Sequence, residues 1–108
     1  MASGFGDMQS LLKQAQDMQR RMQETMRSLS ERALEGSSGG GVVKATVNGN
    51  QELLSIKIDK AAVDPDDVET LEDLVTTAVR QALNAAKELR EQETSKVTGG
   101  MNLPGLGF

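Results

Sequence analysis

The stretch GGGVVKATVNGNQELLSIKID, residues 39–59, decides the fold, because it predicts two strands joined by a tight turn. Apolar and polar residues alternate over 43–47 and again over 56–58, as expected for strands with one buried face. The Asn-Gly pair between these runs is a strong hairpin signal. Leu53 has the opposite parity to Ile56, so we expect a longer loop or a bulge in the second strand.

The residues before this hairpin predict a third strand. We expect residues 32–37 to form this strand, and Ser38-Gly39-Gly40 to turn the chain back into the strand at 43–47. The segment SSGGGVVK could suggest a phosphate-binding loop. It lacks the Gly-Lys-Ser/Thr ending and leads into a strand, so no helix N-terminus is available for a phosphate, and a hairpin loop is the better interpretation.

A long helix is predicted on the N-terminal side of the strands, from Asp7 as its N-cap to about Ser30. No Gly or Pro interrupts this segment, and most of its residues have high helix propensity. Its apolar residues recur three or four positions apart, which is the helical period. They are Met8, Leu11, Leu12, Ala15, Met18, Met22, Met26 and Leu29.

A second long helix is predicted to open at Asp64-Pro65 and to end near Ser95 or Lys96. The acidic residues within 64–73 suit the positive end of the helix dipole and lack the spacing of a calcium loop, so we interpret them as structural. The apolar seam repeats at intervals of three and four, with small residues in its middle: Val68, Leu71, Val75, Ala78, Ala82, Ala85 and Leu89. Residues 1–98 therefore form one domain, and the Gly-rich segment 99–108 is expected to be a mobile tail unless it docks.

The length of the helices predicts a dimer. Residues 65–95 would form a helix of about 46 Å at about 1.5 Å per residue, whereas a compact domain of this size has a radius of gyration of about 13 Å. The helices must extend beyond a small sheet, so they pair with each other, with a second copy of the chain, or with both. The sheet also has open edges that a second copy could cover. A symmetric homodimer would cover the overhang. The predicted interface residues are Leu11, Met18, Met22, Met26, Val75, Ala78 and Ala82.

Composition excludes several classes of function. The chain has no cysteine and no histidine, so thiol chemistry and the commonest general base and metal ligand are absent, and a reducing cytoplasm is the expected location. Only two residues are aromatic, which argues against a base-stacking platform. No run is apolar enough to span a membrane. Neither an enzyme active site, a cofactor, a metal site nor a small-molecule substrate is indicated.

Charge by itself does not indicate a nucleic-acid partner, since the net charge is −4. Lys13, Arg20 and Arg27 recur every seven residues on one stripe of the first helix, and acidic residues fall between them. Each cation therefore has an acidic neighbour three or four positions away, as on an ordinary solvated helix face. In the second helix Lys87 and Arg90 lie among Glu88, Glu91 and Glu93 in the same way.

Four segments in order nevertheless carry a specific resemblance. LLKQAQDMQRRMQE (11–24), the hairpin sequence 39–59, DPDDVETLEDLVTTAVRQALNAA (64–86) and GGMNLPG (99–105) together resemble the YbaB/EbfC family of bacterial nucleoid-associated proteins. The resemblance implies an α+β fold with an α-β-β-β-α protomer, a small antiparallel three-stranded sheet and two long projecting helices in a tweezer-like homodimer. It also implies binding to double-stranded DNA, a cytoplasmic location at the nucleoid, and effects on nucleoid organisation and gene expression, without enzymatic activity, cofactor or metal.

The resemblance further implies that the projecting parts of both helices contact DNA, mainly at phosphates and with little base readout. The matching positions are Lys13, Arg20, Arg21 and Arg27 in the first helix, with Lys87 and Arg90 in the second. An alternative is a protein-interaction adaptor or holdase-like module. That alternative would use the methionine-rich helical surface, which can adapt to different partners.

Overall fold

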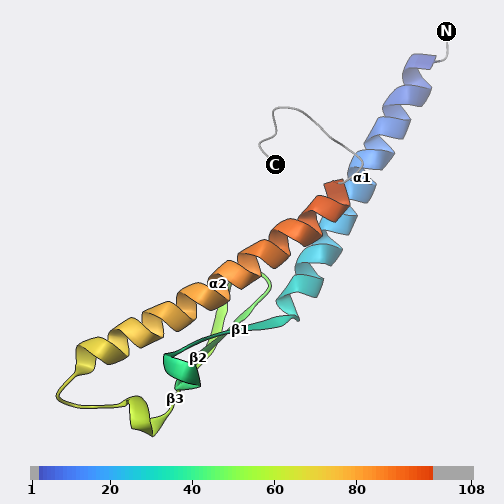
Figure 1. Cartoon of the computed structure of the whole chain (residues 1–108). Coiled ribbons are helices and arrows are strands. Elements are labelled where there is room, and N and C mark those ends of the chain that lie inside the picture. Colours follow the sequence, from blue (N-terminus) through green and yellow to red (C-terminus); the bar gives the residue numbers. More distant parts are fainter. Residues whose placement is uncertain (1–2, 99–108) are drawn as a thin grey trace.

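The protein has an α-β-β-β-α architecture (Figure 1), in a computed structural model that describes residues 3–98. The elements are α1 (Ser3–Ser30), β1 (Ala33–Ser38), the 3-10 turn η1 (Gly39–Gly41), β2 (Val43–Asn48), β3 (Leu53–Ile58), the 3-10 turn η2 (Lys60–Ala62) and α2 (Val68–Thr98). The strands form one antiparallel sheet in the order β1-β2-β3. The predicted fold of the single chain is confirmed, including the third strand, which lies one residue later than predicted. The predicted tail at 99–108 lies outside the described residues.

The register of the hairpin fixes which residues face the core. Val43 pairs with Ile58 and Ala45 with Ile56, so these apolar side chains share one face of the sheet. The pairing shifts at Thr46 and Val47, which confirms the irregularity expected from the parity of Leu53. The shift brings Leu53 opposite Val47, and so onto the apolar face, as a bulge does when it adds one residue to a strand.

The turn between β2 and β3 caps the C-terminal end of α1. The Gly49 backbone N–H lies 2.8 Å from the Leu29 carbonyl oxygen and 3.0 Å from that of Arg32. The Asn50 side-chain amide donates to the Met26 carbonyl oxygen at 2.9 Å. A Cβ atom at position 49 would lie 2.6 Å from the Leu29 oxygen, so only glycine allows this approach. The hairpin thus satisfies the free carbonyl groups of the helix end and holds α1 against the sheet.

The core lies between α2 and the first two strands. Ala78, Ala82 and Ala86 are fully buried against the apolar face formed by Val43, Ala45 and Val47. At the centre of the contact, a Cβ atom at Gly36 would collide with the Ala78 carbonyl oxygen and would lie 2.5 Å from the Ala82 nitrogen. The helix backbone therefore rests almost directly on β1.

This packing corrects part of the predicted dimer interface. The small residues of the α2 seam do allow a close approach, but the partner is β1 of the same chain and not a helix of a second copy. Ala78 and Ala82 are 0% exposed in the single chain, so they are core residues and cannot contribute contact area between chains. Val75, which was assigned to the same interface, is half-buried at the edge of this core.

Both predicted helix starts are wrong. α1 already begins at Ser3, so Asp7 lies inside the helix. α2 begins at Val68, and Asp67 caps it by accepting hydrogen bonds from the backbone N–H (3.3 Å) and the hydroxyl (2.6 Å) of Thr70. Asp64, the predicted cap, accepts a bond from the Asp66 N–H at 3.0 Å and forms a turn instead. Proline suits the second position of such a turn as well as the first position of a helix, so the sequence did not separate the two.

A large apolar surface stays uncovered in the single chain. α2 covers β1 and β2 but barely reaches β3, where Leu53, Leu54 and Ile58 are 50%, 57% and 41% exposed. α1 continues past the end of α2 (Figure 1), and there Leu11 is 63% exposed. The chain measures 79 × 26 × 16 Å with a radius of gyration of 20.9 Å, against about 13 Å for a compact domain of this length.

The contact at Gly36 predicts a strong effect of a larger residue. Gly36→Val should lower the free energy of unfolding by about 3 kcal/mol, because its side chain would displace the α2 backbone from β1. Gly40→Asn is the control, since position 40 has open space around it and asparagine tolerates its positive φ of 72°. Urea denaturation measures both variants. Equal stability of Gly36→Val and the parent chain would show that this close contact does not form.

Candidate nucleic-acid interface

Three of the four predicted DNA-binding cations of α1 lie on its outer face. Lys13, Arg20 and Arg27 are exposed, and the helical period places them on the side opposite Met22, which packs toward α2. Arg20 is partly compensated, since its guanidinium lies 3.6 Å from the Asp17 carboxylate. Both side chains are about half or more exposed, so Arg20 can leave Asp17 and bind another anion at little cost in free energy.

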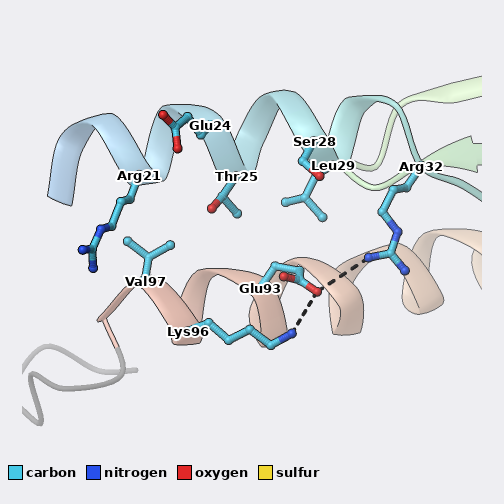
Figure 2. A pocket seen from close by; sticks show the side chains of 9 residues that line it. All are labelled: Arg21, Glu24, Thr25, Ser28, Leu29, Arg32, Glu93, Lys96 and Val97. Carbon is cyan, nitrogen blue, oxygen red and sulfur yellow. Dashed lines mark hydrogen bonds and ion pairs between the residues drawn. The ribbon is translucent and has the colours of Figure 1, made fainter. Parts of the chain in front are cut away.

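Arg21 occupies a different surface. It lines a cleft of about 300 Å³ between α1 and the last turns of α2, where it lies beside Val97 (Figure 2). Glu24, Thr25 and Ser28 form the α1 wall of this cleft. A ligand that contacts Arg20 and Arg21 together must therefore reach around one flank of α1.

An ion-pair clasp closes the inner end of this cleft. The Glu93 carboxylate of α2 lies 3.6 Å from the Arg32 guanidinium and 3.3 Å from the Lys96 ammonium group (Figure 2). Arg32 lies two residues after the end of α1, so the clasp joins the chain at the end of α1 to the last turns of α2. Arg32 is not among the residues predicted from the sequence, because a pairing between residues so distant along the chain leaves no periodic signal.

Lys87 and Arg90 lie on the opposite flank of the helix pair. With Met22, Met26 and Gln51 they line a hollow of about 370 Å³. The six predicted DNA-binding residues thus occupy three surfaces: the outer face of α1, the cleft, and this second hollow. A single straight duplex segment cannot touch all three on one protomer.

Residues 3–98 contain neither a cluster of metal ligands nor a membrane-spanning helix. Within this part of the chain, no three acidic side chains are grouped closely enough to hold a metal ion. The acidic opening of α2 instead uses Asp64 and Asp67 to accept backbone hydrogen bonds, in agreement with the structural interpretation. Among these residues, no helix has the length and apolar character to cross a bilayer.

The chain belongs to the YbaB/EbfC DNA-binding family, whose model matches residues 4–101. It is 52% identical over 103 residues to a nucleoid-associated protein of Caldanaerobacter subterraneus, covering 95% of this chain and 92% of that protein. It is 51% identical over 103 residues to a nucleoid-associated protein of Moorella thermoacetica, covering 95% of this chain and 99% of the other.

A solved structure supports the fold. The crystal structure of an uncharacterized protein from Helicobacter pylori matches with a TM-score of 0.62 and 23% identity. The match covers 72% of this chain and 90% of that one. The resemblance inferred from the four sequence segments is therefore confirmed, as is the α-β-β-β-α fold of the single chain that it implied.

The clasp predicts a small, salt-dependent contribution to stability. Glu93→Gln should lower the free energy of unfolding by about 0.5 kcal/mol at low salt, and this difference should vanish near 1 M salt, because both cations are exposed. Glu88→Gln makes the same charge change at an exposed position outside the clasp. Urea denaturation at the two salt concentrations compares the variants. If Glu93→Gln and Glu88→Gln lowered the free energy of unfolding equally, the clasp would be contradicted.

Proposed function

We propose that this chain binds double-stranded DNA as a homodimer, mainly through phosphate contacts, and acts at the nucleoid in the cytoplasm. The match to the DNA-binding family over residues 4–101 carries this proposal. The relatives named above are nucleoid-associated proteins, which supports the same role here. Bending or bridging of DNA by the dimer would organise the nucleoid and influence gene expression, and would need neither catalysis, a cofactor nor a metal.

The proposed contacts are the six cations already described: Lys13, Arg20, Arg21, Arg27, Lys87 and Arg90. The stripe on α1 supports three of them, Lys13, Arg20 and Arg27, because all three are exposed on one face of a long helix. Long flexible cations on a smooth helix suit phosphate oxygens, which carry no sequence information. We therefore propose binding with little base specificity and with modest affinity, since acidic residues alternate along the same stripe.

The proposed dimer rests on the apolar surface that the single chain leaves open. One part is the face of β3, where Leu53, Ile56 and Ile58 extend the core face of the sheet beyond the reach of α2. β3 is also an edge strand, whose free backbone groups can pair with another strand. The other edge strand, β1, is tied to α2 through a 2.6 Å hydrogen bond from the Ser37 N–H to the Gln81 side chain. The β3 side is thus the open one.

The apolar stripe of α1 is the second part of the proposed dimer surface, with Leu11, Met18, Met22 and Met26. Val75, half-buried on α2, would lie at its margin. The same methionines favour the alternative function, a protein-interaction adaptor or holdase-like module. They line an open apolar groove of about 670 Å³ on α1, together with Ala15, Gln19 and Gln23. Methionine side chains adapt to irregular partners, so this groove would suit a client protein.

DNA binding predicts a steep dependence on salt. A gel-shift titration with a duplex should show binding at micromolar protein in about 50 mM salt and a large loss of affinity in about 200 mM, because released counterions drive the association. No shift at the lower salt would reject DNA binding. Partners that remain in a lysate pull-down after nuclease treatment would then favour the adaptor.

The same assay tests the site. Arg20→Glu/Arg21→Glu should weaken binding at least tenfold on any duplex sequence, because phosphate contacts are lost and repulsion is added. Arg80→Glu is the control for a charge reversal elsewhere, since Arg80 is exposed on α2 and belongs to none of the three proposed contact surfaces. Normal binding by the double variant would remove Arg20 and Arg21 from the interface.

Sedimentation tests the dimer. The parent chain should have twice the 11.6 kDa mass of one chain, and Ile56→Glu should shift it to the single mass by placing a charge on the open face of β3. Ser55→Glu makes a similar charge change at the neighbouring residue, which faces the other side of the sheet, and should stay dimeric. A parent chain that remains at the single mass at high concentration would reject the homodimer.

A further inference from the structure

Two lysines face each other on the sheet surface that α2 does not cover. Lys44 of β2 pairs with Lys57 of β3 in the antiparallel register. Their neighbours Val43 and Ala45 are buried beneath α2, so the alternation of a strand turns both lysines to the opposite face. Both lysines are exposed.

Like charges directly opposite each other on adjacent strands repel and lower the stability of a sheet. Neither lysine forms an ion pair with a carboxylate anywhere in the described range 3–98. The residue that pairs with Lys44 on its other side is Ser37, which is neutral. This pair therefore differs from the cations of α1, each of which has an acidic residue three or four positions away.

The acidic residues near this sheet face, Glu35 and Asp59, form no ion pair with either lysine. Glu35 of β1 pairs with Thr46 and not with a lysine. Asp59, which follows β3, accepts a hydrogen bond from the Ala61 N–H at 3.0 Å and caps η2. The positive charge of Lys44 and Lys57 is thus left for an external anion.

The glycine turn η1 leaves the approach to this pair open. Lys44 Cε would lie 3.9 Å from a Cβ atom at Gly41, so the lysine stem extends along the turn. Gly39, Gly40 and Gly41 carry no side chains, and nothing lies within 4 Å of a Cβ position at Gly40. A bulky polyanion can therefore come close to the lysine without meeting a side chain of the turn.

We propose that Lys44 and Lys57 form a second phosphate-binding surface, on the outer face of the sheet, that contacts the DNA backbone separately from the helical cations. This inference rests on the proposed DNA binding. Lysines on edge strands also prevent sheets from joining, but β2 is the central strand, so edge protection does not account for Lys44. A role in binding explains why an unfavourable pair occupies the middle of a small sheet.

The test is the salt dependence of DNA binding by Lys44→Gln/Lys57→Gln, measured by fluorescence anisotropy with a labelled duplex. Each lost phosphate contact should reduce the slope of log K against log salt by about 0.9, so the variant's slope should be shallower by about 1.8 for each protomer whose sheet face contacts the duplex. When one protomer makes this contact and salt rises from about 50 to about 200 mM, the factor by which the variant loses affinity should therefore be roughly one twelfth of the factor for the parent chain. The single variant Lys57→Gln should show half of the change in slope.

Two controls separate binding from folding. Lys44→Arg/Lys57→Arg keeps the charge and should retain the parent slope. The melting temperature of the glutamine variant should be no lower than that of the parent, because a repulsive pair has been removed. If the glutamine variant had the same salt slope as the parent chain, the lysine surface would be overturned and the proposed function would remain intact. If this variant were also less soluble than the parent chain, Lys57 would be assigned to edge protection. If the parent chain bound no DNA, both proposals would fail together.

Discussion

The close contact between α2 and β1 at Gly36 is the constraint on which the rest of the structure depends. No side chain separates the helix backbone from the strand at this point, and the alanines of α2 fill the remaining space against β2. The core is consequently thin and made of small residues. It fixes the position of α2 over two strands and leaves the third uncovered. The apolar face of β3 is thus a consequence of how the protomer packs, and it is the strongest argument for a second copy of the chain.

The position of α1 follows from the burial of Leu29 near its C-terminal end and from two sets of polar contacts. Its C-terminal carbonyl groups are satisfied by the turn at 48–50, and the clasp of Arg32, Glu93 and Lys96 joins it to the end of α2. Beyond these contacts α1 has no support from the sheet, so its first turns extend away from the domain. A projecting amphipathic helix must then present an apolar stripe and a charged stripe together. This combination is the reason for our proposal that one helix contacts both a second chain and a polyanion.

The charge of the chain must be judged surface by surface. The excess of acidic residues is concentrated after residue 63, and two of them, Asp64 and Asp67, are used in turns and caps at the start of α2. The cations are distributed over the outer face of α1, the two flanks of the helix pair, and the outer face of the sheet. Because interactions between exposed charges are screened over about 10 Å at moderate salt, a net negative charge is compatible with local contacts to phosphate.

The sequence by itself determined the elements and their order, since the period of the apolar residues, the Asn-Gly turn and the parity of Leu53 are local properties. It also carried the family resemblance. Local signals did not locate the helix starts. At α2, both Asp64 and Asp67 are suitable caps, and at α1 the helix extends through glycines to Ser3. Only the tertiary structure decided that Ala78 and Ala82 pack on Gly36, that Arg32 meets Glu93, and that Lys44 faces Lys57. The physical reason is that a helical period shows which residues share a face but not what covers that face, which depends on how distant segments pack.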